Sequence, residues 1–151
     1  SPFFLSWEDT STTNISPNYY REYILPEING WCDILHASGK RYIQHACGWL
    51  NDLLPDIAGS KIDVLESVSP APTGNIQMQR VQEILPPRIS VIGGIEPVEL
   101  LEFPKDQVVG RAQELLQCMK GRGYVLANSD SCPPGVTVEK FRALADLVKN
   151  S

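Results

Sequence analysis

Several features are scarce or absent in this sequence, and each absence excludes a class of protein. No stretch approaches the ~18 to 20 consecutive apolar residues that are needed to span a bilayer, so we expect no membrane-spanning segment. Lysine and arginine form no run, and the 151-residue chain has a net charge of −5 from 13 basic and 18 acidic side chains. Because nucleic acids and anionic lipid surfaces attract basic proteins, we expect neither as a partner.

Cysteine is also scarce. The four cysteines are too few and too widely spaced for the disulfide framework of a small secreted protein. The opening residues, Ser1 to Leu5, lack the basic flank and the length of a signal peptide. We therefore expect a cytoplasmic location. Since the chain has no initiator Met and opens on an apolar, strand-like run, we also expect it to be a piece of a longer protein.

Five short apolar runs alternate with helical patterns, which is typical of βαβ units around a parallel sheet. Asn75 is a candidate helix cap, the pair Gly93-Gly94 is expected to close the fourth strand, and His36 suits the end of the first helix. The predicted strands are residues 2–7, 41–45, 62–68, 89–92 and 124–127, and the predicted helices are residues 17–37, 49–57, 75–85, 105–120 and 137–149.

Two folds accommodate this alternation: an open doubly wound sheet, or part of a TIM (β/α)8 barrel. An open sheet of this kind often has a glycine-rich phosphate turn after its first strand, and this chain has none. A closed barrel typically needs ~250 residues. The sequence therefore favours a barrel fragment with about five parallel strands, and we take residues 1–151 as one partial barrel domain.

Candidate metal ligands follow two of the predicted strands. His45 and Cys47 end the second strand with one residue between them, and Cys132 lies in the loop after the fifth. The loops that leave the carboxyl ends of parallel strands share one face, so these side chains are expected to meet there. One imidazole and two thiols suit zinc, with Glu66 as a candidate fourth ligand.

Such a site suggests a class of reaction. A thiol that binds zinc loses its proton near neutral pH while it keeps its nucleophilic character. Thiol alkylation, with a small thiol as the substrate, is therefore the expected reaction. Glu8 and Asp9, at the end of the first strand, are candidates for substrate contact, whereas Cys32 and Cys118 lie inside predicted helices and are expected to pack in the core.

The same residues resemble a known family. The similarity covers nearly the whole chain and is to the C-terminal half of the uroporphyrinogen decarboxylase superfamily. Within it, the His-x-Cys…Cys pattern is similar to that of cobamide-dependent methyltransferases, which transfer a methyl group from a methyl-corrinoid protein to a thiol such as coenzyme M. The segments that carry the similarity are His45-Ala46-Cys47-Gly48, Ile62–Glu66, Val91–Pro97, Gly123–Leu126 and Pro133–Val136.

This resemblance implies the C-terminal half of a TIM barrel, with His45, Cys47 and Cys132 as zinc ligands and a corrinoid carried by a partner protein. Decarboxylases of the superfamily have a histidine where this chain has Ser131-Cys132, which argues against porphyrinogen decarboxylation. Family members are about twice as long as this chain. Because an open half-barrel leaves strand edges and apolar surface uncovered, we expect the missing N-terminal half, or self-association, to complete it.

Two further functions stay open. One is a metal-free decarboxylase that acts on a tetrapyrrole or a related acid. The other is a noncatalytic half-barrel subunit. Porphyrin binding without bound metal would indicate the decarboxylase, and a neighbouring reading frame that encodes the missing barrel strands bears on the half-barrel subunit.

Overall fold

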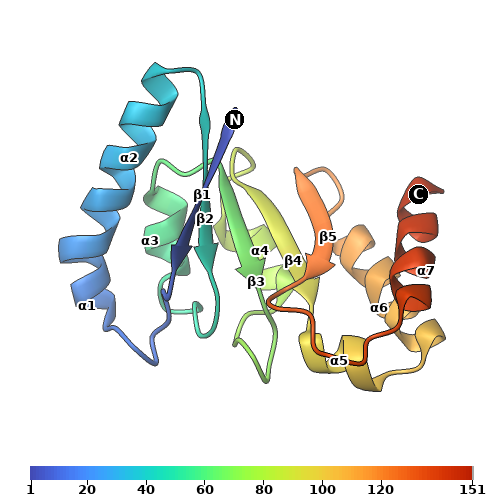
Figure 1. Ribbon diagram of the computed structural model, residues 1–151. Coiled ribbons are helices and arrows are strands. Elements are labelled where there is room, and N and C mark those ends of the chain that lie inside the picture. The colour runs from blue at the N-terminus through green and yellow to red at the C-terminus, as the bar shows by residue number, and fades with distance from the viewer. Residues whose placement is uncertain (151) are drawn as a thin grey trace.

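The computed structural model describes residues 1–150, which form one five-stranded parallel sheet with helices between the strands (Figure 1). The strands pair in the order in which they occur along the chain, and every neighbouring pair is parallel. The strands are β1 (Phe3–Glu8), β2 (Arg41–Ala46), β3 (Val64–Val68), β4 (Ser90–Ile95) and β5 (Tyr124–Asn128).

The first helical segment is continuous but changes its winding, because a π-helical stretch separates two α-helices. Ser16 caps its start by accepting a hydrogen bond from the Tyr19 N–H. The helical elements are α1 (Pro17–Tyr19), η1 (Tyr20–Ile24), α2 (Leu25–Ala37), α3 (Leu54–Gly59), α4 (Met78–Ile84), α5 (Pro97–Glu102), α6 (Lys105–Cys118) and α7 (Val138–Lys149). None of the helices within residues 1–150 combines the length and the apolar character needed to cross a bilayer.

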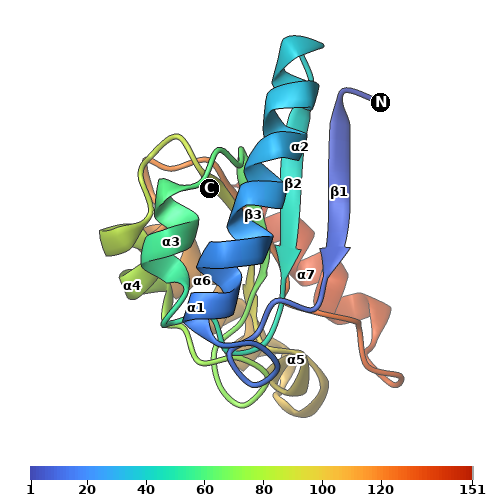
Figure 2. The ribbon, with the colours of Figure 1, turned by 90° about the vertical axis from the view of Figure 1, so that its left-hand side faces the viewer.

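The strand order distinguishes the two candidate folds. In a doubly wound sheet the strand order reverses and helices cover both faces. Here the order never reverses, and parallel crossovers are almost always right-handed, so successive helices fall on the same face. Figure 2 shows α2, α3 and α4 together on one side of β1 and β2. The chain is therefore a portion of a TIM-barrel sheet, which confirms the predicted fold class.

The two faces of the sheet differ in burial. On the face that the helices cover, Tyr42, Leu65 and Val91 are buried in the core. On the opposite face, Trp7 is 78% exposed and Val125 is 54% exposed. This second face, which would line the inside of a closed barrel, is called the open face below.

Some local predictions were wrong. Strand β4 continues through Gly93 and Gly94 to Ile95, since glycines with positive φ still pair with β5. Asn75 does not cap α4, which begins at Met78; its side-chain oxygen accepts hydrogen bonds from the backbone N–H groups of Leu50 and Asn51.

Two further side chains, Glu96 and His36, make contacts that the sequence did not indicate. The sequence analysis missed helix α5, which is capped by the buried Glu96 carboxylate through the Val98 and Glu99 N–H groups. His36 lies in the last turn of α2, where a basic side chain was expected, and its Nε2 lies 2.8 Å from the carboxylate of Asp63. The His36 contact joins segments far apart in sequence, so helical periodicity does not reveal it, whereas the Glu96 cap is local.

Candidate functional site

The core of the candidate site is a contact between His45 on β2 and Glu66 on β3. These residues are register partners in the parallel ladder, so their side chains leave the same face of the sheet. The Nδ1 atom of His45 lies 2.5 Å from Oε2 of Glu66, and His45 is only 7% exposed. The ring of Trp7, on β1, lies over the imidazole with 4.8 Å between ring centroids. Glu66 and Trp7 together fix the orientation of the imidazole.

Cys47 follows β2 directly and faces the same space. With Trp7, Glu8, Asp9 and His45 it lines a cavity of about 260 Å³. Burial raises the pKa of the Cys47 thiol, and the negative charges of Asp130 and Asp9 raise it further. The thiol is therefore protonated at neutral pH in this acidic surrounding, and a bound cation would favour the thiolate.

The loop after β5 is held across the ends of β3 and β4. Ser129 is fully buried; its hydroxyl donates to the Ile95 carbonyl at 3.0 Å and accepts from the Gly94 N–H at 2.9 Å. The Ser67 hydroxyl, on β3, donates to the Ser129 carbonyl. Ser67 has a φ of 72°, in the left-handed region that favours glycine, at a register shift of the strand. These contacts bring Asp130 close enough to act on Cys47.

Sequence reasoning missed Ser67, Ser129 and Asp130. Asp130 could have been noticed, because it lies two residues before Cys132 in a loop that was already expected at this edge. The two serines gave no signal, since their roles depend on a bulge and on a contact between strands that are not adjacent in the sheet.

Cys132, another of the predicted ligands, lies in the loop after β5. It is exposed, and its Sγ contacts the carbonyl of its neighbour Pro133 at 3.7 Å. Within residues 1–150, no group of three or more His, Cys, Asp or Glu side chains is arranged to hold a metal ion. The donors have the chemistry that zinc prefers, and His45, Cys47 and Glu66 share one region, but the complete ligand set is not assembled in this arrangement. Zinc ligation by these four residues stays a prediction.

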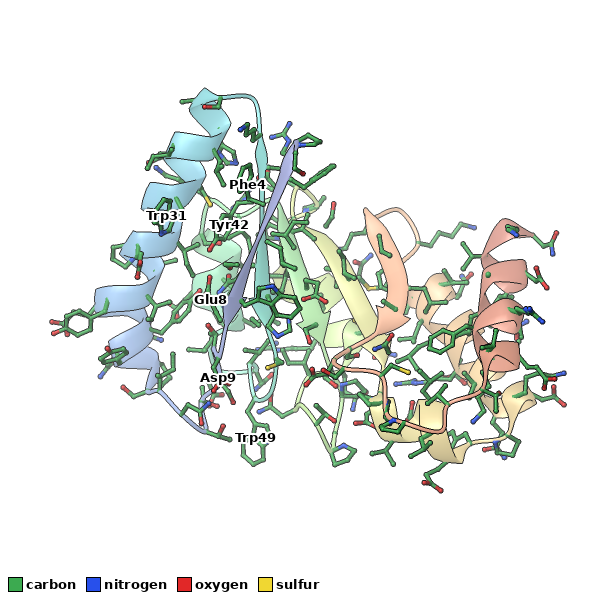
Figure 3. The ribbon with its side chains drawn as sticks, in the orientation of Figure 1. Phe4, Glu8, Asp9, Trp31, Tyr42 and Trp49 are labelled. Atoms are coloured by element: carbon green, nitrogen blue, oxygen red, sulfur yellow. The ribbon has the colours of Figure 1, made fainter. Side chains whose placement is uncertain are left out.

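Glu8 lies on the other side of β1, toward α2, where it holds a hydrogen-bond network together. Its two carboxylate oxygens accept from Ser6 at 2.5 Å, Tyr42 at 2.8 Å, and Thr10 and Gln44 at 3.2 Å. Figure 3 shows Glu8 and Tyr42 in the region between α2 and the first two strands.

Asp9, the next residue, is exposed at the end of β1. Asp9 and Glu8 both line the cavity beside Cys47 and a cavity of about 330 Å³ between β1 and α2. The two candidates differ in their contacts, because the Glu8 carboxylate is engaged in the network with Tyr42 whereas the negative charge of Asp9 acts on Cys47. The substrate-binding role of Glu8 and Asp9 stays a prediction.

A parallel sheet in sequential strand order, with polar side chains at its carboxyl ends, defines a domain of the TIM-barrel class. The family model described as uroporphyrinogen decarboxylase (URO-D) matches residues 4–151. The chain belongs to this family, as the sequence motifs predicted.

Comparison with solved structures gives the same fold. A methyltransferase from Methanosarcina mazei superposes with a TM-score of 0.79 and is 22% identical in sequence. The match covers 98% of this chain but 41% of that protein, so this chain spans less than half of its length. No curated protein sequence matches the chain. At this identity the likeness establishes the fold, and the activity has to be argued from the site.

Proposed function

We propose that this chain is part of a zinc-dependent enzyme that transfers a methyl group from a methyl-corrinoid to a small thiol. The observation that supports this most is the placement of His45 and Cys47 at the end of β2, with Glu66 bonded to the imidazole. An imidazole whose Nδ1 is held by a carboxylate keeps Nε2 available as a metal ligand. The similarity to a methyltransferase is consistent with this reaction.

The side chains have distinct roles in this proposal. His45, Cys47 and Cys132 would hold the zinc ion, with Glu66 either as a displaceable ligand or as the acceptor that orients His45. A zinc ion bound there would lower the pKa of a thiol substrate so that it reacts as a thiolate. The corrinoid would supply the methyl group to the thiolate sulfur and would keep the electron pair of the carbon–cobalt bond.

The carboxylates around Cys47 help to explain why a cation belongs at this position. Asp9, Glu66 and Asp130 all raise the pKa of the Cys47 thiol, so their negative charges disfavour an isolated thiolate. A divalent cation reverses this effect because it neutralises the local charge. We infer that zinc binding releases the Cys47 proton and that the site binds zinc more tightly as the pH rises.

The open face supports a proposal about partners. Trp7 and Leu5 are exposed on it, and β1 has no neighbour on its outer edge within residues 1–150. Exposed apolar surface and an unpaired strand edge favour association. We propose that further β/α elements complete the barrel, from another segment or through self-association, and that the corrinoid is carried by a separate protein that approaches the carboxyl ends of the strands.

Metal analysis of the purified chain tests the zinc site. We expect about one zinc per chain in the wild type and a large loss in Cys47→Ser. The matched control is Cys118→Ser, because Cys118 is a half-buried thiol at the end of α6, on the helix side of the sheet. Equal zinc contents in the two variants would contradict the proposal. A metal-free chain that binds a porphyrin would favour the decarboxylase alternative instead.

A further inference from the structure

A second cavity, of about 550 Å³, lies at the opposite end of the strands. Arg41, the first residue of β2, lines it, whereas Cys47 follows the last residue of that strand. At ~3.3 Å per residue, a six-residue strand separates the two ends by roughly 15 to 20 Å. The cavity is therefore distinct from the site around His45.

The lining of this cavity is basic, which is unusual in a chain with a net charge of −5. Four side chains that are cationic or can become so, His36, Arg41, Lys61 and Arg88, line it with a single carboxylate, Asp63. Because these basic side chains cluster in a chain whose net charge is negative, the cavity attracts anions.

Asp63 offsets only part of this charge. Its carboxylate already accepts hydrogen bonds from the Tyr42 N–H at 2.8 Å, from His36 at 2.8 Å and from Arg41 at 3.1 Å. Lys61 pairs with Asp33, but both side chains are more than half exposed, so the pair is weak. Two carboxylates, Asp63 and Asp33, face the three permanent cations Arg41, Lys61 and Arg88, so positive charge remains available to a ligand.

Arg88 contributes a charge that no carboxylate offsets. Its guanidinium donates only to backbone carbonyls, to Ser60 at 2.7 Å, Ala58 at 3.0 Å and Ile62 at 3.3 Å. No Asp or Glu among residues 1–150 lies within ion-pair distance of it. These three bonds fix the position of the guanidinium at the cavity, so little side-chain entropy is lost when an anion binds.

We propose that this cavity binds a small phosphate-bearing molecule. Arginine guanidinium groups match the geometry of phosphate oxygens, and the Ser90 side chain lines the same cavity as a further polar group. Phe3, which is 54% exposed, and Val64 line the cavity as well, so an apolar part of the ligand has a surface to pack against. The proposal does not depend on methyl transfer, because none of these residues belongs to the site at the carboxyl ends.

Calorimetric titration of the purified chain tests this proposal with inorganic phosphate, phenyl phosphate and benzoate as probes. We expect phosphate to bind, phenyl phosphate to bind more tightly because its ring contacts Phe3 and Val64, and benzoate to bind most weakly. Affinity should fall as potassium chloride is raised, since the attraction is electrostatic. Failure of both phosphates to bind at millimolar concentration would overturn the proposal, as would benzoate binding as well as phenyl phosphate.

Substitutions then place the binding in this cavity. In the double variant Arg41→Gln with Lys61→Gln, the affinity for phenyl phosphate should fall at least tenfold. The matched control, Lys120→Gln with Lys149→Gln, removes two positive charges elsewhere on the surface and should leave the affinity unchanged. Both variants should keep the circular dichroism spectrum of the wild type, since the substituted side chains are exposed. Equal affinities in the two variants would show that binding is elsewhere and would overturn the proposal.

Discussion

The Nδ1 atom of His45 and the Oε2 atom of Glu66 lie 2.5 Å apart across adjacent strands of the sheet. A carboxylate in this position accepts the Nδ1 proton, fixes the tautomer and leaves Nε2 free to bind a metal. The structure thus gives Glu66 a role that the sequence did not suggest. Its own ligation of zinc stays a prediction.

This contact predicts an effect on metal affinity. Substitution Glu66→Gln should weaken binding of Co²⁺, a spectroscopic substitute for zinc, by about 10- to 100-fold, because the imidazole loses its charged acceptor. The measurement is a titration followed by the visible absorption of cobalt. The control is Glu139→Gln on the exposed surface of α7, which should bind Co²⁺ like the wild type. Equal affinities in the two variants would show that Glu66 does not support the metal site.

The open face predicts that the chain associates in solution. Trp7 and Val125 expose 78% and 54% of their surface on this face, and burial of apolar surface stabilises association. Sedimentation velocity should show a mass that rises with concentration, and Trp7→Lys with Val125→Lys should shift the chain toward the monomer. Val138→Lys with Val148→Lys, on the exposed side of α7, should leave association unchanged. A wild type that is monomeric at every concentration would contradict this prediction.

The network around Glu8 predicts a change in stability. Burial raises the pKa of Tyr42 well above its ordinary value, so its hydroxyl stays protonated and donates to Glu8 at 2.8 Å. Substitution Tyr42→Phe should lower the free energy of unfolding by about 1 kcal/mol, the usual contribution of one such hydrogen bond. Urea denaturation measures this change. Tyr19→Phe, at an exposed tyrosine, should change the stability by less than about 0.5 kcal/mol, and equal losses in both would argue against the network.

Asp63 predicts how stability depends on pH. Burial alone would raise its pKa, but the Tyr42 N–H, His36 and Arg41 together lower it below the ordinary value of 3.8. A lowered pKa in the folded state means that Asp63 stabilises the fold above pH 3.8 and that this contribution disappears as the pH falls through the folded-state pKa.

Thermal unfolding measured from about pH 2 to about pH 6, a range that includes the ordinary pKa of Asp63 and lower values, checks this prediction. Asp63→Asn should lower stability at pH 6 by about 2 kcal/mol, as expected for lost hydrogen bonds to a charged group, and should flatten the decline in acid. Asp33→Asn, at an exposed carboxylate paired only with Lys61, should leave the decline unchanged. If the Asp63→Asn variant loses stability in acid as steeply as the wild type, other carboxylates cause the decline and the prediction is wrong.

The candidate site was only partly predictable. The strand ends placed His45 and Cys47 at one rim because two residues at the end of one strand stay together in any βα unit. The position of Glu66 near this rim also followed, because it lies near the end of the next strand along the chain, but its direct contact with His45 depends on the register of β2 and β3. The exposed position of Cys132 could not be predicted, because it depends on the path of the loop after β5, which Ser67 and Gly94 hold through Ser129.

The sequence by itself determined the alternation of strands and helices, the parallel sheet and the family, because apolar periodicity and helix-ending residues act over short distances along the chain. Only the tertiary structure decided which side chains share a surface. Strand register turned Glu66 toward His45, a bulge at Ser67 joined β3 to the β5 loop, and packing of distant segments gathered Arg41 and Arg88 around one cavity. Such contacts depend on the three-dimensional path of the backbone, which local sequence patterns do not encode.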